Sequence, residues 1–259
     1  KNISQAAIKL ECAQSNVTLR IKQLEKNLGF KLFNRVSKGV KLTFEGEKLL
    51  PDALQIVHKI EQTISKMQNL DKSKILKLGS SQVNAPIRLI PLISKLKEKF
   101  DNTKLEIYTN TSLLVIESVL NYDIDIAFVC GKPNNKRLKV IKEFEEQLCI
   151  VEAKGISINN TVFTYIKSCI YYQHLCKLLK DKNNNKFNTV EIQNYETILA
   201  CVELGMGRAI LPINLIKKYG YENKLITCKI KNSKDFSTYL VSRADFDSQI
   251  CDYLKKENI

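Results

Sequence analysis

The chain has 259 residues, of which 44% are hydrophobic and 26% charged, and it carries a formal net charge of +14. This composition is typical of a folded globular protein and excludes a disordered chain. No stretch is apolar for long enough to cross a bilayer, so we expect no membrane interaction. The positive charge favours a polyanionic partner such as nucleic acid.

Eight cysteines and two histidines are the residues best suited to metal or redox chemistry. The cysteines are scattered without a Cys-x-x-Cys pair, which indicates reduced thiols rather than a disulfide framework. Two histidines are too few for a multi-histidine metal centre, and the sequence contains no recognisable nucleophile–base pair or phosphate loop. We therefore expect a cytoplasmic protein that is not an enzyme, with no catalytic residues, no metal and no cofactor.

Residues 4–42 show two short helical patterns, and residues 1–46 hold nine basic against three acidic side chains. We predict a first helix capped by Ser4, a turn at 11–13, and a second helix from Gln14 to Leu28. Leu10 faces inward, and so does a stripe on the second helix formed by Val17, Ile21, Leu24 and Leu28. The opposite face carries side chains suited to base edges and phosphates: Gln14, Ser15, Asn16, Thr18, Arg20 and Lys22. An ordinary helical hairpin with a solvated polar face would show the same pattern.

A long helix follows, and Thr43 is its expected N-cap. Pro51 near its start should kink it. Apolar residues recur along it at alternating spacings of three and four: Leu50, Ala53, Val57, Ile60, Ile64 and Met67. This seam predicts coiled-coil dimerisation. A buried helix within a single globular domain is the alternative.

From about residue 75, β-branched runs alternate with helical segments, which predicts an α/β fold with a mostly parallel sheet. The expected strands are 75–78, 105–108, 124–129, 148–151, 162–166 and 239–241. The expected helices are 85–100, 112–121, 171–180, 195–205, 212–218 and 247–256.

The N-terminal motifs resemble the winged helix-turn-helix of LysR-type transcription regulators. They match at Ala6-Ala7, Leu10, Gln14-Ser15, Ile21, Leu24-Glu25, Leu28-Gly29, Leu32-Phe33, Arg35, Leu42-Thr43 and Gly46. The resemblance implies that residues 14–22 form the recognition helix in the major groove. It also implies a wing at 35–41, with Gly39 at its turn and Arg35, Lys38 and Lys41 on the phosphate backbone. The sequence departs from the family at Ala13, where a capping Ser or Thr is usual. The family's first helix would precede Lys1, so we expect the natural start to lie upstream.

The residues after 74 resemble the effector domain of the same family, which has two Rossmann-like α/β subdomains. The matches include Leu78-Gly79-Ser80, Arg88-Leu89, Pro91, Asp125, Ala127-Phe128-Val129, Gly131, Glu145-Glu146, Leu148, Gly205-Met206-Gly207 and Leu211-Pro212. The resemblance implies a DNA-binding domain at 1–46, a dimerisation linker helix at 47–73 and an effector domain at 74–259. Subdomain one would comprise 74–150 and 243–259, and subdomain two 151–242, with crossover strands near 148–151 and 239–241.

Four polar loops follow predicted strands, where ligands of open α/β sheets bind. The expected effector-binding residues are Ser80, Ser81, Gln82, Asn84, Thr109, Asn110, Thr111, Ser168, Cys169, Gln193 and Asn194. Any one of them could simply cap a helix, so the prediction depends on the loops converging. Val83 and Tyr172 stand where a hydroxyl residue and an Arg are common in the family, which makes an anionic effector a weaker expectation.

These observations predict a sequence-specific regulator that binds double-stranded DNA as a homodimer or homotetramer. A small-molecule effector between the two subdomains would control it. One alternative is a small-molecule binding protein without DNA binding. Another is a redox sensor that acts through Cys169, which would require an exposed thiol with a lowered pKa.

Overall fold

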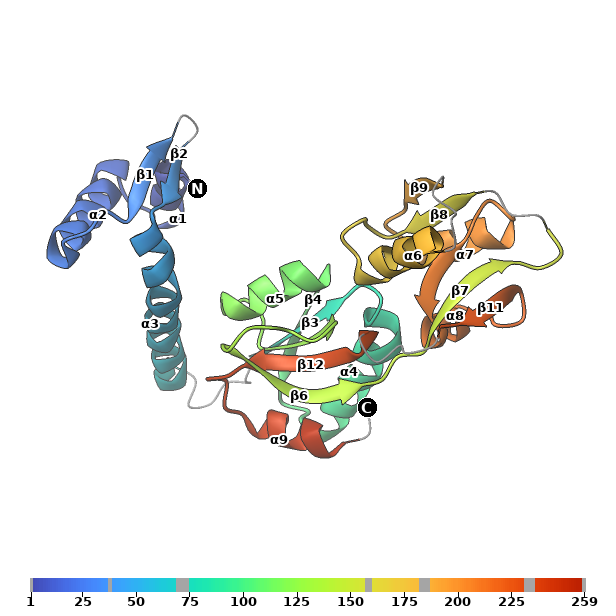
Figure 1. Cartoon of the computed structure of the whole chain (residues 1–259). Helices are drawn as coiled ribbons and strands as arrows, with labels where there is room; N and C mark the ends of the chain where they lie inside the picture. Colours follow the sequence, from blue (N-terminus) through green and yellow to red (C-terminus); the bar gives the residue numbers. More distant parts are fainter. Residues whose placement is uncertain are drawn as a thin grey trace. The chain divides into compact units, whose positions relative to one another are not determined.

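The computed structural model describes residues 2–36, 39–68, 75–156, 160–181, 187–230 and 236–257. The chain divides into two compact units, Lys1–Lys72 and Ser73–Ile259 (Figure 1). Within the described residues, no helix is both long and apolar enough to cross a membrane.

The first unit contains two short helices, a hairpin and a long helix. They are α1 (Ile3–Lys9), α2 (Gln14–Leu28), β1 (Phe33–Val36), β2 (Gly39–Leu42) and α3 (Phe44–Gln68), which continues through Pro51. Asn2 caps α1, because its Oδ1 accepts the Ser4 N–H at 2.8 Å, so the prediction of Ser4 as the cap was wrong. Ala13 gives α2 no side-chain cap. Gly39 has a φ of +123°, as expected for the turn of the wing.

Residues of the sequence motif hold the hairpin against the helices. The Glu25 carboxylate accepts the Leu32 N–H at 2.8 Å, which ties α2 to the start of the hairpin. The Thr43 hydroxyl donates to the Lys31 carbonyl at 2.7 Å and accepts the Gly46 N–H at 3.0 Å. A Cβ on Gly46 would lie 2.3 Å from the Leu32 carbonyl oxygen. The motif therefore specifies a close junction between the hairpin and α3.

The predicted apolar stripe of α2 is only partly covered. Val17 and Ile21 are half-buried, but Leu24 and Leu28 are 46% and 41% exposed. Leu10 is also exposed, contrary to prediction. With 7 residues α1 is about 10 Å long, whereas α2 with 15 residues is about 22 Å long, so α1 is too short to cover the whole stripe of α2.

The second unit has two lobes. The first lobe contains β3 (Ile75–Ser81), the π-helical turn η1 (Ala85–Leu89), α4 (Ile90–Lys99), β4 (Lys104–Asn110), α5 (Ser112–Leu120), β5 (Ile126–Cys130), β6 (Leu138–Phe144), β12 (Thr238–Arg243) and α9 (Gln249–Lys256). Its sheet has the order β4-β3-β5-β12-β6. The β3 strand is parallel to β4 and β5, whereas β12 is antiparallel to β5 and β6. The expected mostly parallel sheet is therefore mixed, because β12 enters it from the other lobe in the reverse direction.

The alternation of side chains along β5 builds both faces of this sheet. Ile126 and Phe128 belong to one apolar cluster, together with residues of α4 and α9. Ala127 and Val129 belong to another, together with Val115 of α5. A central strand that is apolar on both faces explains the continuous apolar run in the sequence.

The second lobe contains β7 (Leu148–Ala153), β8 (Thr161–Thr164), α6 (Ile170–Asp181), β9 (Asn188–Glu191), α7 (Tyr195–Glu203), β10 (Ala209–Pro212), α8 (Ile213–Lys218) and β11 (Leu225–Lys229). An antiparallel sheet has the order β10-β7-β11, and β8 pairs in parallel with β9. The β7 strand lies wholly in this lobe and β12 wholly in the first. The crossings therefore precede Leu148 and Thr238, which corrects the boundaries predicted at 150/151 and 242/243.

Candidate functional site

A cavity of about 300 Å³ lies between the two lobes of the second unit. The first lobe contributes the carboxyl ends of β3, β4 and β5 and the start of α5. The second lobe contributes residues 165–166 and 168–171 and Tyr195 at the start of α7. The polar loops at these strand ends thus meet around one space, as ligand sites of α/β folds do.

Six of the predicted effector-binding residues line this cavity: Ser81, Gln82, Asn110, Thr111, Ser168 and Cys169. The other five do not. Ser80 and Asn84 are fully buried in the first lobe, and Thr109 accepts a hydrogen bond from Gln82 Nε2 at 3.3 Å. Asn194 is exposed and caps α7 through the Thr197 N–H at 2.8 Å, and Gln193 beside it is exposed. For Asn194, helix capping is therefore the role that the structure supports.

Sequence reasoning missed the aromatic and aliphatic part of the cavity wall. Tyr165 and Tyr195 stack on each other, with ring centroids 5.2 Å apart and planes inclined by 22°. Both line the cavity, and further lining residues are Val83, Ser112, Leu113, Ile116, Cys130, Ile166, Ile170 and Tyr171. The signal was present, because these residues lie in or next to the predicted loops, but only hydroxyl and amide side chains and Cys169 were assigned to the site.

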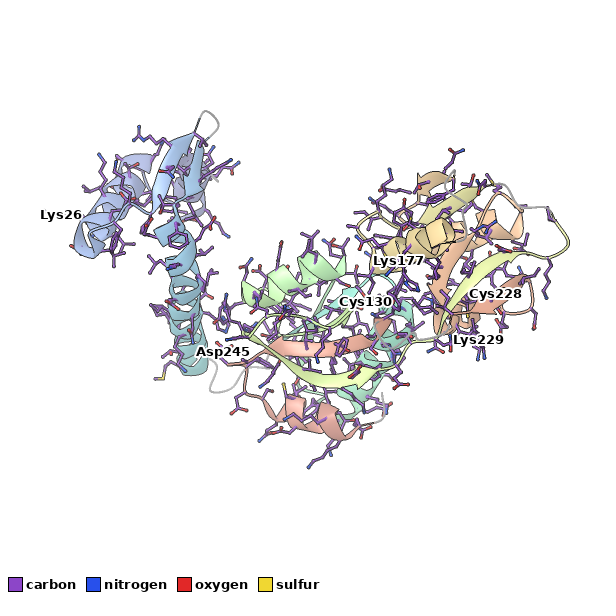
Figure 2. All side chains as sticks on the ribbon, viewed as in Figure 1. Lys26, Cys130, Lys177, Cys228, Lys229 and Asp245 are labelled. Atoms are coloured by element: carbon purple, nitrogen blue, oxygen red, sulfur yellow. The ribbon has the colours of Figure 1, made fainter. Side chains whose placement is uncertain are left out.

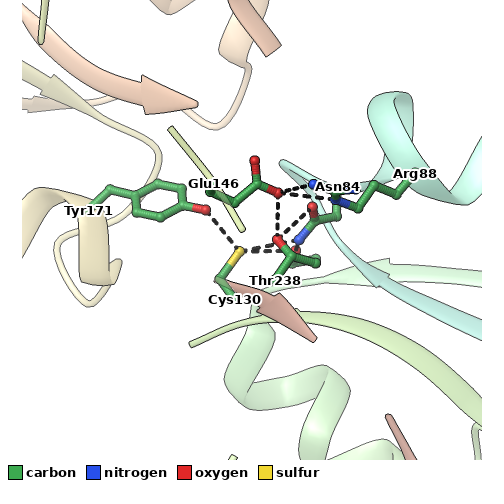
Figure 3. A network of polar contacts seen from close by, with 7 residues as sticks. Asn84, Arg88, Cys130, Glu146, Tyr171 and Thr238 are labelled. Atoms are coloured by element: carbon green, nitrogen blue, oxygen red, sulfur yellow. Dashed lines mark hydrogen bonds and ion pairs between the residues drawn. The ribbon is translucent and has the colours of Figure 1, made fainter. Parts of the chain in front are cut away.

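A chain of polar contacts connects the cavity wall to the segments that join the lobes (Figure 3). At the cavity end, the Cys130 sulfur accepts hydrogen bonds from Tyr171 Oη and Asn84 Nδ2, each at 3.3 Å. The Asn84 Oδ1 lies 3.1 Å from Thr238 Oγ1, and Thr238 Oγ1 lies 2.9 Å from Glu146 Oε1. Glu146 lies just before β7 and Thr238 is the first residue of β12, so the contacts connect the cavity wall with the two places where the chain crosses between the lobes.

An ion pair lies at the far end of this chain. Arg88 Nη2 is 2.6 Å from Glu146 Oε1, and the Glu146 side chain is fully buried. The Arg88 guanidinium also lies over the Phe144 ring, 4.4 Å from its centroid. The second oxygen, Glu146 Oε2, is buried without a hydrogen-bond partner among the described residues. Removing either partner would leave the other charge buried.

Cys169 does not have the properties that a reactive thiol needs. Burial raises its pKa to about 11, although the backbone N–H groups of Tyr171 and Tyr172 oppose the shift. Burial likewise raises the pKa of Cys130, which lines the same cavity (Figure 2). Both thiols are therefore protonated near neutral pH. Cys169 does not have the lowered pKa that the redox-sensor alternative requires.

The first unit presents most of the predicted DNA-binding side chains to solvent. Gln14, Ser15, Asn16, Arg20 and Lys22 on α2 are exposed, as are Arg35 on β1 and Lys41 on β2. Thr18 is half-buried, and its hydroxyl donates to the Gln14 carbonyl at 3.0 Å. Lys38 lies outside the described residues.

The predicted dimer seam on α3 is exposed along its second half. Val57, Ile60, Ile64 and Met67 are 53%, 54%, 49% and 71% exposed. Four aliphatic side chains at this spacing form one apolar stripe that no other part of the described first unit covers.

Two family descriptions match the chain. "Bacterial regulatory helix-turn-helix protein, lysR family" matches residues 1–47, and "LysR substrate binding domain" matches residues 71–249. The regulator GltR of Bacillus subtilis is 30% identical over 254 residues, which are 94% of this chain and 86% of the relative. The regulator CzcR of Bacillus thuringiensis is 31% identical over 256 residues, covering 94% of this chain and 84% of the relative.

Solved structures with the same fold include a full-length OxyR variant from Pseudomonas aeruginosa. It is 18% identical, with a TM-score of 0.68 over 98% of this chain and 88% of the other. Full-length CbnR in complex with its target DNA is 15% identical, with a TM-score of 0.56 over 98% of this chain and 92% of the other.

A helix-turn-helix unit joined to a two-lobed unit with a central cavity is the architecture of a ligand-controlled DNA-binding regulator. The chain belongs to the LysR family and is a LysR-type transcription regulator with an effector-binding domain. The resemblance seen in the sequence motifs is thereby confirmed, and the alternative of a binding protein without a DNA-binding role is set aside.

Proposed function

We propose that the chain binds a near-palindromic DNA duplex as a cytoplasmic homodimer or homotetramer and that a small molecule in the interlobe cavity controls this binding. The observation that carries the proposal is the cavity itself, where loops from two lobes meet beside the crossing segments. A ligand that contacts both lobes changes their relative stability, and such a change can be transmitted to DNA affinity. We propose no catalytic role, since the relatives are named as regulators.

Two groups of residues on the first unit have different proposed roles. The exposed side chains Gln14 and Asn16 at the start of α2 would read base edges in the major groove. Arg35 and Lys41 on the hairpin, with Lys38, would contact phosphates and supply affinity without sequence preference. Two half-sites would be bound together through the apolar stripe on α3.

The test is titration of a fluorescent operator duplex and of an unrelated duplex at several salt concentrations. Arg35→Ala should weaken binding to both duplexes about tenfold and flatten the salt dependence, whereas Gln14→Ala should lower the ratio between them. Lys26→Ala is the matched control, because Lys26 is an exposed cation near the C-terminal end of α2 (Figure 2). Equal loss of discrimination in both variants would contradict the two roles.

A further inference from the structure

We propose that the interlobe cavity binds a small uncharged aromatic molecule and discriminates against carboxylates and cations of the same shape. The inference rests on the proposed function, in which this cavity holds the effector, and it adds the chemical class of that effector.

The charge of the cavity wall is the first argument. Among the described residues that line it, none is Lys, Arg, His, Asp or Glu. Arg88 Nη2 and Glu146 Oε1 are 2.6 Å apart, so the two nearby charges compensate each other, and neither residue lines the cavity. A buried carboxylate or ammonium group needs a partner of opposite charge, and this wall provides none.

The ionisable groups of the wall do not change this conclusion. Cys130, Cys169, Tyr171 and Tyr195 all line the cavity, and burial raises the pKa of each. All four are therefore uncharged at neutral pH. Among the described residues of the wall, the polar side chains that can bond a ligand carry hydroxyl, thiol and amide groups.

Helix N-termini are the feature that would most favour an anion, because their free N–H groups carry partial positive charge. Here part of that capacity is already used within the chain. The Thr111 hydroxyl accepts the Leu114 N–H at 3.5 Å at the start of α5. At the start of α6 the N–H groups of Tyr171 and Tyr172 act on the Cys169 sulfur. What remains suits a carbonyl or hydroxyl oxygen better than a full negative charge.

The aromatic character of the ligand follows from the stacked tyrosines. Tyr165 and Tyr195 form an offset pair in the wall, and a flat ring can extend such a stack. Aliphatic side chains of Ile116, Ile166 and Ile170 supply further apolar surface in the same cavity. Asn110, Gln82 and Ser168 add polar groups for one neutral polar substituent.

Three probes of nearly equal shape separate the possibilities: benzamide, benzoate and benzamidine, which are neutral, anionic and cationic at pH 7. Isothermal titration of the full chain should give a Kd for benzamide at least tenfold below those of benzoate and benzamidine. An equal or lower Kd for benzoate or for benzamidine would overturn the proposal. Absence of binding by all three up to their solubility would overturn it as well.

A pair of neighbouring variants tests the charge argument directly. Leu113 lines the cavity and is 65% exposed, whereas Leu114 is 44% exposed and is not a lining residue. Leu113→Arg should lower the Kd of benzoate relative to that of benzamide at least fivefold, and Leu114→Arg should leave the ratio unchanged. Equal effects of the two variants would contradict a neutral wall at this cavity.

Failure here is distinguishable from failure of the proposed function. A preference for benzoate that Tyr165→Leu abolishes would overturn the ligand class while leaving the cavity as the effector site. Unchanged benzamide binding in Tyr165→Leu would instead show that the cavity is not where the probe binds, and would count against both proposals.

Discussion

The two units of the chain bury their apolar side chains to very different extents. Among the described residues of the first unit, the buried apolar side chains are Ala7, Leu32 and Val40. The second unit has three apolar clusters, one of them in the second lobe and one on each face of the five-stranded sheet. Because apolar burial is the main stabilising contribution to folding, we expect the second unit to be stable on its own and the first to depend on assembly.

Breaking the assembly should therefore have the largest effect. Ile60→Asp puts a charge into the proposed α3 interface, and symmetry puts it there twice. We expect the dimer Kd to rise about 1,000-fold, which corresponds to about 4 kcal/mol. Analytical ultracentrifugation measures the change, and operator affinity should fall with it because two half-sites are no longer bound together.

Gln55→Asp is the control for this variant, since residue 55 is exposed on the opposite side of α3. It should leave the dimer intact. If Ile60→Asp stays dimeric at low micromolar concentration, the apolar stripe has another role.

Gly46→Ala should destabilise the first unit without changing the stability of the second. Its Cβ would lie 2.3 Å from the Leu32 carbonyl oxygen, so the hairpin or α3 must shift, and we expect a loss of about 3 kcal/mol in the first unit alone. Calorimetry should show the first unit melting earlier and the second unchanged. Gly29→Ala, at φ +76° but in open space, should cost about 1 kcal/mol.

Glu146→Gln addresses the second unit instead. The variant keeps the hydrogen-bonding shape but leaves Arg88 without its charged partner at a site where Glu146 is fully buried. We expect the free energy of unfolding, from urea titration, to fall by about 2 kcal/mol. The control Glu203→Gln breaks the exposed ion pair with Lys224, and it should change the free energy of unfolding by less than about 0.5 kcal/mol. Equal effects would mean that burial does not set the strength of the Arg88 pair.

The raised pKa of the Cys169 thiol predicts that the stability of the second unit depends on pH. The pKa of this thiol is about 11 in the folded chain and 9.0 ordinarily. Its contribution to the free energy of unfolding is therefore complete below pH 9 and is lost as the pH rises to 11. Cys169→Ser should remove about 2 kcal/mol of the alkaline loss in the free energy of unfolding, measured by urea titration at pH 8 and 11. Cys228→Ser is the control, because Cys228 is exposed (Figure 2). An alkaline loss of the same size in Cys169→Ser as in the unaltered chain would contradict the raised pKa of Cys169.

The smallest expected effects distinguish Asn194, which caps a helix, from Asn110, which lines the cavity. Asn194→Ala removes the cap of α7 and should cost about 1 kcal/mol of stability in urea titration, with benzamide affinity unchanged. Asn110→Ala should do the reverse and weaken benzamide about tenfold, because Asn110 lines the cavity. Loss of benzamide affinity in Asn194→Ala would show that Asn194 is a binding residue and not only a helix cap.

These contrasts also explain how much the sequence could predict. The motif residues predicted the helix-turn-helix and wing, because Glu25, Thr43 and Gly46 act locally. The apolar runs predicted β3, β4 and β7. The strands β6, β9, β10 and β11 were missed, since they are short or carry charged residues such as Lys142 and Glu191 within them.

Contacts between residues far apart in the sequence could not be predicted from local patterns. Arg243 is buried and donates to the Ile124 carbonyl at 2.6 Å, across 119 positions of sequence. Arg208 pairs with Glu152 at 3.3 Å. The same holds for the site: loop positions could be predicted, but which of their side chains face the cavity depends on strand alternation, as Ser80 and Ser81 show.

The junction at Thr43 has a mechanical consequence. One hydroxyl bridges the Lys31 carbonyl before the hairpin and the Gly46 N–H in the first turn of α3. We therefore expect the wing and the start of α3 to move as one rigid body. In the proposed dimer, the angle at which two copies of α3 cross would set the distance between the two wings. We then expect the crossing angle of the two α3 helices, at a distance from every base pair, to select the curvature of the duplex that the dimer binds.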